Sequence, residues 1–309
     1  MQKKISGMLI TAGFCFLFYL ILSHPAESVL YAFTGLTLWF QKMIPALFPF
    51  MILTGLMIRM ELTVPFARLL LPFFKPLFKG ISVSGVYCII MGFLCGFPMG
   101  AKVVSELYGR DELSCREASF LLAFCNNIGP VYFTGYVMPL LGITKPLPYV
   151  VGMYGIPLLY GMVLSRILKL PCEKDAALAS WKDNKNNKKS GSILVYLDSS
   201  ILSAIESITR LGGYMILFNL LNLVCLVVLP EGLLPLANAL LEVTSGIGRM
   251  KDTMPVMTLV LLTFGGLSCM AQTYSIIRGT GLSFRAYCRH KGILTALTAL
   301  YYGILRILL

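Results

Sequence analysis

Residues 81–108 read ISVSGVYCIIMGFLCGFPMGAKVVSELY, an apolar run that the motif GFPMGAK interrupts at 96–102. An apolar run of about 20 residues is long enough to cross roughly 30 Å of hydrocarbon as a helix. Glycine and proline in the middle of such a helix free backbone groups, which protein, water or a ligand must then satisfy. The run therefore predicts a membrane segment whose interruption carries a function.

The rest of the chain repeats this apolar character. Of its 309 residues, 57% are hydrophobic and only 13% are charged, whereas soluble domains contain about 25% charged residues. A chain of this composition cannot bury all of its apolar surface away from water, so we expect one all-α polytopic membrane domain over 1–309, in the cell membrane. Further stretches of spanning length lie at 5–23, 117–138, 147–168, 255–277 and 292–309, and interrupted ones at 36–58 and 193–229.

The amino-terminal stretch and the net charge both point to a lipid environment. We interpret 5–23 as a retained anchor helix rather than a cleaved signal peptide, because no small-residue cleavage site follows it. The formal net charge of +12 is spread over short loops beside apolar runs, where anionic lipid headgroups attract it. We therefore expect membrane lipids as partners and no nucleic acid.

Signals for catalysis or for a bound metal are weak. The sequence has no Walker A loop, no His-Glu-x-x-His and no Gly-x-Ser-x-Gly. Ser268 and His290 could be imagined as nucleophile and base, but no third group orients them. The nine cysteines include no Cys-x-x-Cys and only two histidines are present, so they are typical of packing residues. We expect no enzyme activity, no catalytic residue, no metal and no cofactor.

The chain divides into two similar halves on either side of a polar, lysine-rich loop at 171–191. Leu-Ser-x-Arg occurs at 113–116 and again at 282–285, a separation of 169 residues. We predict repeats over 36–139 and 193–309, with a connecting helix at 147–168 that has no counterpart; the alternative is chance similarity between apolar sequences. Because this single helix lies between the repeats, the second repeat would be inserted upside down in the membrane. Inverted repeats with broken helices are typical of secondary transporters.

Each repeat is predicted to contain a re-entrant hairpin, followed by two transmembrane helices. We place the hairpins in the interrupted stretches 36–58 and 193–229; the alternative is that these two stretches span the membrane. Pro45 and Pro49 would break the first hairpin, and Gly212 and Gly213 the second. The glycine breaks at 96–100 and 266–270 are expected to correspond, because they lie one position off the common spacing.

Polar groups inside apolar runs are the candidate binding residues, because such groups are costly in lipid. Lys102 follows a helix start whose amide groups suit an anion, and the alternative is a packing kink. Lys42 is either an anion attractor or a lysine that snorkels at a helix end. Asn126 and Asn127 either bind a ligand or satisfy the interrupted turn.

A second group of polar candidates lies in the carboxy-terminal half. Glu206 and Arg210 are four residues apart, so an ion pair is the simpler interpretation and a proton-coupling Glu206 the sharper one. Gln272 aligns with Lys102 and is either a binding contact or an interhelical hydrogen bond. The predicted binding set is Lys42, Pro49, Gly96, Phe97, Pro98, Gly100, Lys102, Asn126, Asn127, Gly129, Pro130, Glu206, Gly213, Gly266, Ser268 and Gln272.

At 96–102, 113–114 and 124–130 the sequence resembles the YlbJ-type sporulation integral membrane proteins, of the nucleoside recognition (Gate) domain group. The resemblance covers roughly 30–309. It implies a fold similar to the core of concentrative nucleoside transporters, with hairpins and inverted repeats. It also implies transport of dipicolinic acid across the outer forespore membrane during sporulation.

The residue patterns predict a carrier for a small anionic metabolite, and the resemblance implies that this metabolite is dipicolinic acid. Two alternatives stay open: a non-transporting membrane scaffold for sporulation or envelope assembly, and a carrier of a nucleoside-like solute. We expect a small anionic solute as the soluble partner, and we leave open whether the protein forms a homo-oligomer.

Overall fold

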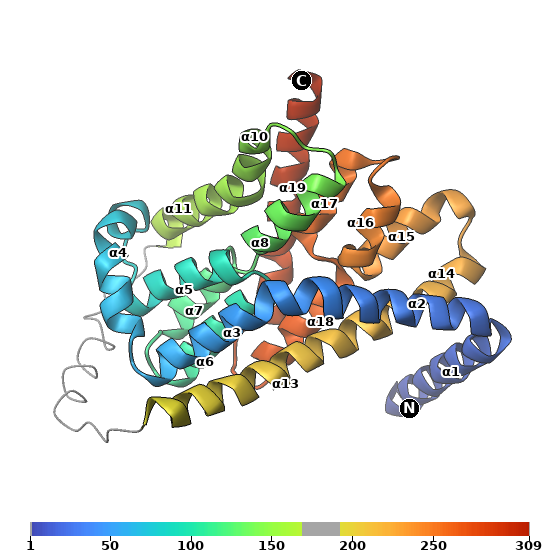
Figure 1. Cartoon of the computed structure of the whole chain (residues 1–309), viewed down its shortest axis with the longest axis horizontal. Coiled ribbons are helices and arrows are strands. Elements are labelled where there is room, and N and C mark those ends of the chain that lie inside the picture. The colour runs from blue at the N-terminus through green and yellow to red at the C-terminus, as the bar shows by residue number, and fades with distance from the viewer. Residues whose placement is uncertain (1, 169–191, 309) are drawn as a thin grey trace.

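The computed structural model describes residues 2–168 and 192–308, so the predicted polar loop at 171–191 lies outside the described residues. Within those two ranges the chain forms helices and no strand (Figure 1). The helices are α1 (Gln2–Ser23), α2 (Pro25–Leu38), η1 (Trp39–Met43), α3 (Ile44–Arg59), α4 (Thr63–Leu77), α5 (Val83–Cys95), α6 (Met99–Gly109), α7 (Cys115–Leu122), α8 (Pro130–Tyr132), η2 (Phe133–Val137), α9 (Met138–Leu140), α10 (Pro146–Val150), η3 (Val151–Gly155), α11 (Ile156–Leu168), α13 (Ile193–Leu220), α14 (Asn222–Val228), η4 (Glu231–Leu233), α15 (Leu234–Leu241), α16 (Val243–Met250), α17 (Pro255–Phe264), α18 (Gly266–Ile277) and α19 (Phe284–Leu308).

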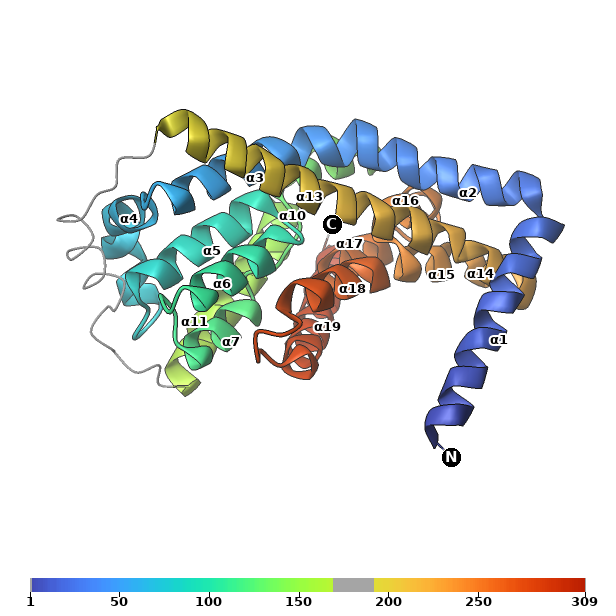
Figure 2. The same ribbon diagram turned by 90° about the horizontal axis from the view of Figure 1, so that it is seen from below.

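Two long helices run side by side through the molecule (Figure 2). α2, η1 and α3 form one helix over Pro25–Arg59, and α13 with α14 forms another over Ile193–Val228. The prediction of re-entrant hairpins at 36–58 and 193–229 is therefore wrong. Pro45 stands in the first turn of α3, directly after the π-helical turn η1, where the hydrogen-bond ladder is already shifted and tolerates the missing N–H.

Glycine serves close packing between these two helices. The Trp39 indole lies over Gly212, where a Cβ would come within 2.6 Å of the ring, and the indole N–H donates to the Ile208 carbonyl at 2.8 Å. Small residues that let helices approach are typical of membrane interfaces. Gly213 faces away, with open space around it. Gly212 therefore lets α13 pack closely against its neighbour, and neither glycine breaks α13.

The structure places its hairpins elsewhere. α5 and α6 pack side by side and are joined by 96–98, which contains a cis peptide bond before Pro98; α15 and α16 pack side by side and are joined at Glu242. Their arms have 13, 11, 8 and 8 residues, and a helix rises only about 1.5 Å per residue. None can cross about 30 Å of hydrocarbon, so the predicted span at 81–108 is instead a short hairpin.

Each hairpin is followed by a broken helix. After the first hairpin, α7 ends at Leu122 and helix resumes only at Pro130, inside the span predicted at 117–138. After the second, α17 gives way to α18 at Gly265, whose φ is +87°. The predicted correspondence between 96–100 and 266–270 is therefore wrong, since one is a hairpin tip and the other a break within a helix. In Figures 1 and 2 the two hairpins lie toward opposite ends of the molecule.

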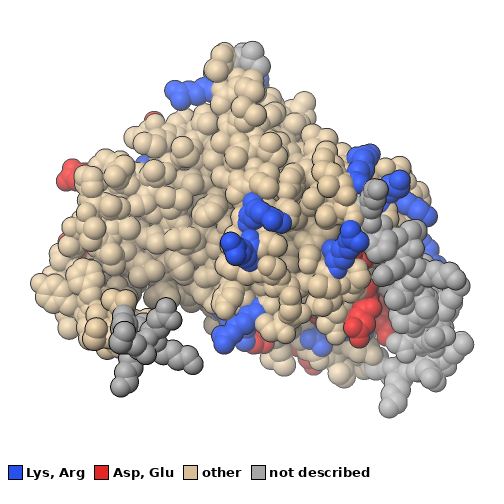
Figure 3. Space-filling model, turned by 180° about the vertical axis from the view of Figure 1, so that it is seen from behind, with Lys and Arg blue, Asp and Glu red and all other residues tan. Residues whose placement is uncertain are grey.

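The surface suits a lipid environment. Four helices among the described residues are long and apolar enough to span a membrane: Pro25–Arg59, Pro146–Leu168, Ile193–Val228 and Pro255–Ile277. Large apolar side chains such as Leu22, Phe73 and Leu147 are well exposed. Most of the face shown in Figure 3 carries neither acidic nor basic side chains. Such a surface is stable only where hydrocarbon replaces water.

Candidate functional site

The tip of the first hairpin lies directly against the break of the following helix. Gly96 has φ +81°, a conformation that suits glycine. A Cβ there would overlap the amide nitrogen of Gly129, and one at Gly100 would overlap the carbonyl oxygen of Cys125. The two interrupted backbones therefore meet with no side chain between them.

The tip of the second hairpin lies against the other break in the same way. A Cβ at Gly266 would come within 3.1 Å of the amide nitrogen of Val243. Within the hairpin, a Cβ at Gly246 would overlap the backbone of Ala239. Glycine thus brings together the tip at Glu242 and the kink between α17 and α18.

A small cavity of about 50 Å³, here called the tip pocket, lies between the two tips and the two breaks. One of its polar atoms, Gln272 Oε1, is buried and has no hydrogen-bond partner among the described residues. Buried polar atoms are rarely left without a partner, so the pocket can accept a hydrogen-bonding molecule. Its lining is Met43, Leu47, Phe97, Ile128, Gly129, Tyr132, Leu211, Met215, Glu242, Val243, Thr244, Leu262, Cys269 and Gln272.

The Glu242 carboxylate lies in the tip pocket, and Glu242 is only 1% exposed. Its Oε1 accepts from the Thr244 hydroxyl and its Oε2 from the Ser245 amide, both at 2.9 Å. These bonds cap α16. Among the described residues no cation forms a salt bridge with Glu242, so its charge is hydrogen-bonded but not neutralised.

Lys291, on α19, is the buried cation of the same region and is 2% exposed. Its Nζ donates to the Asn126 carbonyl at 2.7 Å and to Asn127 Oδ1 at 3.5 Å. It also lies 4.3 Å from the centroid of the Phe97 ring, within the range of a cation–π interaction. One ammonium group therefore joins the first break to the first tip.

The two asparagines hold the break together. Asn126 Oδ1 accepts from the Ala101 amide at 3.4 Å, in the first turn of α6. Its Nδ2 donates to Thr273 Oγ1 at 3.0 Å and to the Tyr287 hydroxyl at 3.1 Å. Asn127 Nδ2 donates to the Phe124 carbonyl. Their polar groups serve the protein itself, and Asn126 occupies part of the α6 amino terminus predicted to face a ligand.

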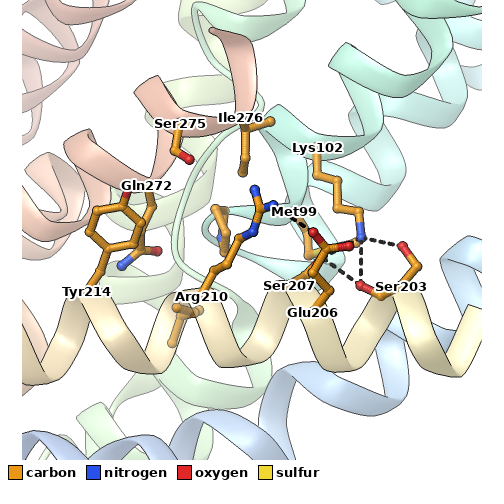
Figure 4. A pocket seen from close by; sticks show the side chains of 12 residues that line it. Met99, Lys102, Ser203, Glu206, Ser207, Arg210, Tyr214, Gln272, Ser275 and Ile276 are labelled. Carbon is orange, nitrogen blue, oxygen red and sulfur yellow. Dashed lines mark hydrogen bonds and ion pairs between the residues drawn. The ribbon is translucent and has the colours of Figure 1, made fainter.

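A second cavity, of about 200 Å³, lies between α6, α13 and α18 and is here called the Lys102 pocket (Figure 4). Lys102 Nζ donates to the hydroxyls of Ser207 at 2.6 Å and Ser203 at 3.1 Å. Its partners are neutral, and it forms no salt bridge within the described chain, so it retains its attraction for an anion. The lining is Pro98, Met99, Lys102, Ser203, Glu206, Ser207, Arg210, Leu211, Tyr214, Gln272, Ser275 and Ile276.

The two cavities adjoin. Leu211 and Gln272 line both of them. Glu206 and Arg210 form an ion pair of 2.6 Å at the open side of the Lys102 pocket, with both side chains 64% exposed. A solute that entered beside Lys102 would thus meet Gln272 before it reached the tip pocket.

The structure brings only part of the predicted set together. Phe97, Gly129 and Gln272 line the tip pocket, and Pro98, Lys102, Glu206 and Gln272 line the Lys102 pocket. Seven predicted residues line neither pocket: Gly96, Gly100, Asn126, Asn127, Pro130, Gly266 and Ser268. The Ser268 hydroxyl accepts a hydrogen bond from Gln272. Lys42 is exposed, 5.2 Å from the centroid of the Tyr136 ring, and Pro49 and Gly213 are also exposed outside both pockets.

Sequence reasoning missed Tyr132, Glu242 and Lys291. Glu242 falls within an amphipathic, proline-containing stretch at 230–254, although a carboxylate followed by Thr244 and Ser245 is a helix-capping pattern. Lys291 stands just outside the apolar run at 292–309. α19 begins earlier, at Phe284, and carries Lys291 into the interior. A lysine directly before an apolar run was the available signal.

Comparison with known proteins gives one informative match. The chain is 28% identical to the sporulation integral membrane protein YlbJ of Bacillus subtilis (strain 168), over 92% of this chain and 79% of the relative. No family model and no solved structure matches it. Together with the apolar helices, this similarity supports a YlbJ-type assignment and a multi-pass integral membrane protein.

Proposed function

Taking the chain as a YlbJ-type integral membrane protein, we propose that it is a carrier for a small anionic solute and acts in sporulation. The observation that carries this proposal is the meeting of two hairpin tips and two helix breaks around the tip pocket. Discontinuous helices that meet at a central polar site are typical of secondary transporters. A scaffold has no need for a buried amide oxygen left unpartnered by the described residues at such a point.

In this proposal the two halves are inverted repeats, each made of a hairpin followed by a broken helix. α5 to α9 form the first unit and α15 to α18 the second. Their hairpins lie toward opposite ends of the molecule and their tips meet at one cavity (Figure 1), which supports the inversion. We propose that this arrangement corresponds to the concentrative nucleoside transporter core that the family resemblance implies.

The charges favour an anion over a nucleoside. Lys102 offers an ammonium group beside two serine hydroxyls, a set that suits a carboxylate. Arg210 lines the same pocket. Dipicolinate, a small aromatic dicarboxylate, is the specific substrate that we propose, with the outer forespore membrane as the location. Its ring would suit Tyr214 in this pocket and Phe97 in the next.

Transport requires the tip pocket to widen. It measures about 50 Å³, against about 200 Å³ for the Lys102 pocket. A solute held beside Lys102 therefore passes onward only when a hairpin tip moves away from the opposite break. Movement of one packed unit against another around a fixed site would give alternating access.

Uptake of labelled dipicolinate into vesicles that contain the purified protein tests the proposal. Wild type should accumulate label above empty vesicles. Lys102→Met should lower the initial rate at subsaturating solute by about tenfold or more, since a charge-assisted hydrogen bond contributes roughly 1.5–3 kcal/mol. Lys251→Met, which removes a lysine outside both pockets, is the matched control and should transport normally.

Three outcomes would count against parts of the proposal. No uptake by correctly inserted wild type would remove the carrier. Inhibition by uridine but not by dipicolinate would favour a nucleoside-like solute. A Lys102→Met protein that supports normal sporulation despite lost transport would favour the scaffold.

A further inference from the structure

We infer that Glu242 carries the proton that couples transport, so that the protein is a proton–anion symporter. This inference rests on the proposed function, because it takes the tip pocket as the path of the solute. The coupling ion is then a proton, and the residue that binds it is one buried carboxylate.

Glu242 stands where an anion would have to pass. It lies at the second hairpin tip, lines the tip pocket and is 1% exposed. Two negative charges a few ångströms apart repel strongly where water is excluded. An ionised Glu242 and an anionic solute therefore exclude each other from this pocket. A protonated Glu242 removes the repulsion and offers an O–H donor to the solute.

The carboxyl group has room for a proton. Oε1 accepts from the Thr244 hydroxyl and Oε2 from the Ser245 amide, and the two oxygens of a carboxylate together offer about four lone-pair sites. A proton can thus bind while the cap of α16 is preserved. Each cycle would take up one proton from the side where the solute enters, forming an O–H bond on Glu242. The proton would be released to water on the other side, after the solute.

No other group near Glu242 replaces it in this role. Tyr132 of α8 and Cys269 of α18 line the same pocket, and Tyr136 of η2 is near enough to interact with Glu242 electrostatically. Phenols and thiols ordinarily have a pKa far above that of a carboxyl group. Lys291 lies near Cys269 and donates to the first break, and Lys42 lies over Tyr136. No salt bridge within the described residues fixes Glu242 as an anion.

Glu206, the coupling carboxylate that the sequence suggested, is unsuited to the task. Its side chain is 64% exposed and paired with Arg210 at 2.6 Å. It also lies outside the lining of the tip pocket, the proposed path of the solute. The buried Glu242, which no cation neutralises, is the group whose protonation a bound anion would change.

The experiment compares wild type with Glu242→Gln in vesicles, using two measurements on each. Counterflow, in which trapped unlabelled dipicolinate drives entry of label, needs no net proton movement. Accumulation driven by an acid exterior does. Wild type should show both. Glu242→Gln, which mimics the protonated carboxyl, should accumulate no more label with the pH gradient than without it, and its remaining counterflow should not respond to pH.

The control is Glu231→Gln, which neutralises an exposed glutamate just before the second hairpin, outside both pockets. It should behave as wild type in both measurements. Accumulation by Glu242→Gln that still follows the pH gradient would overturn the inference. Wild-type counterflow with no response to the gradient would overturn it while leaving the carrier intact.

A measurement on wild type alone covers the case in which Glu242→Gln does not fold. Dipicolinate added to unbuffered vesicles should raise the external pH as protons enter with it. Solute entry without that rise would overturn the inference. If wild type neither takes up nor exchanges dipicolinate, the proposed function fails together with the coupling.

Discussion

The two hairpins share a backbone plan and differ in how their tips are held. The first tip, at Gly96 and Phe97, is apolar and is fastened from outside by Lys291 of α19. The second tip, at Glu242, is acidic, and its carboxylate bonds to its own neighbours Thr244 and Ser245. One tip therefore depends on a distant helix and the other on its own sequence.

This difference shows that backbone and charge are arranged independently in this protein. Glycine contacts position both tips against both breaks. The buried cation Lys291 and the buried carboxylate of Glu242 both lie near Cys269. Glycine contacts therefore place both hairpin tips in the same way, and one charged residue near each tip, Lys291 or Glu242, determines the local chemistry.

The largest effect should come from adding one methyl group to the first tip. Gly96→Ala places a Cβ onto the Gly129 amide at a positive φ, and should destabilise the protein by more than about 3 kcal/mol. Gly266→Ala, where the nearest atom is 3.1 Å away, should cost only about 1–2 kcal/mol, mainly through its left-handed backbone. Melting temperatures of the detergent-solubilised variants measure both.

The control for this comparison is Gly213→Ala, which has open space around it within α13. It should melt at or slightly above the wild-type temperature, since alanine favours a helix by about 1 kcal/mol over glycine. Equal losses at Gly96 and Gly266 would show that the two tips are held alike, and the contrast between them would then fail.

A smaller effect should follow from loss of the buried cation. Lys291→Met leaves the Asn126 carbonyl without its donor, and an unsatisfied buried acceptor costs about 1–3 kcal/mol. The variant should unfold at lower denaturant than wild type. Thr244→Val at the second tip should lose less, because Glu242 keeps its bond from the Ser245 amide. The reverse order would mean that the second tip is the more tightly held.

The smallest effect is expected at the open side of the Lys102 pocket. The ion pair of Glu206 and Arg210 is mostly exposed, and such pairs contribute about 0–1 kcal/mol. Replacing both by glutamine should shift the free energy of unfolding by no more than about 0.5 kcal/mol. A larger loss, measured by denaturant titration, would show that this side is part of the structural core.

The sequence predicted the lipid environment and the presence of helix breaks better than it predicted the positions of the hairpins. Apolar length and scarce charge identified a helical membrane protein, and the glycine motif at 96–102 marked a real break. The hairpins were misplaced because proline and glycine signal a special backbone without saying which kind. Pro45 follows a π-helical turn, and Gly212 lies under the Trp39 indole. Only tertiary contacts distinguish these uses.

The sequence predicted only part of the site, again because tertiary contacts determine which residues are buried together. Lys102 and Gln272 were found because they are polar residues inside apolar runs. Lys291 escaped notice because the helix start at Phe284 decides its burial, and the cluster of charges around it is typical of a loop. Asn126 was recognised as important, but its partners Thr273 and Tyr287 are more than 140 positions away in the chain.

Chemical protection of Cys269 tests most directly whether the solute passes between the tips. Cys269 lines the tip pocket, and the exposed Cys115 serves as an internal control. Mass spectrometry would follow the alkylation of each by N-ethylmaleimide. We predict that dipicolinate, at a concentration that saturates uptake, slows the reaction at Cys269 and leaves Cys115 unchanged. Equal rates at Cys269 with and without dipicolinate would contradict a solute path between the tips.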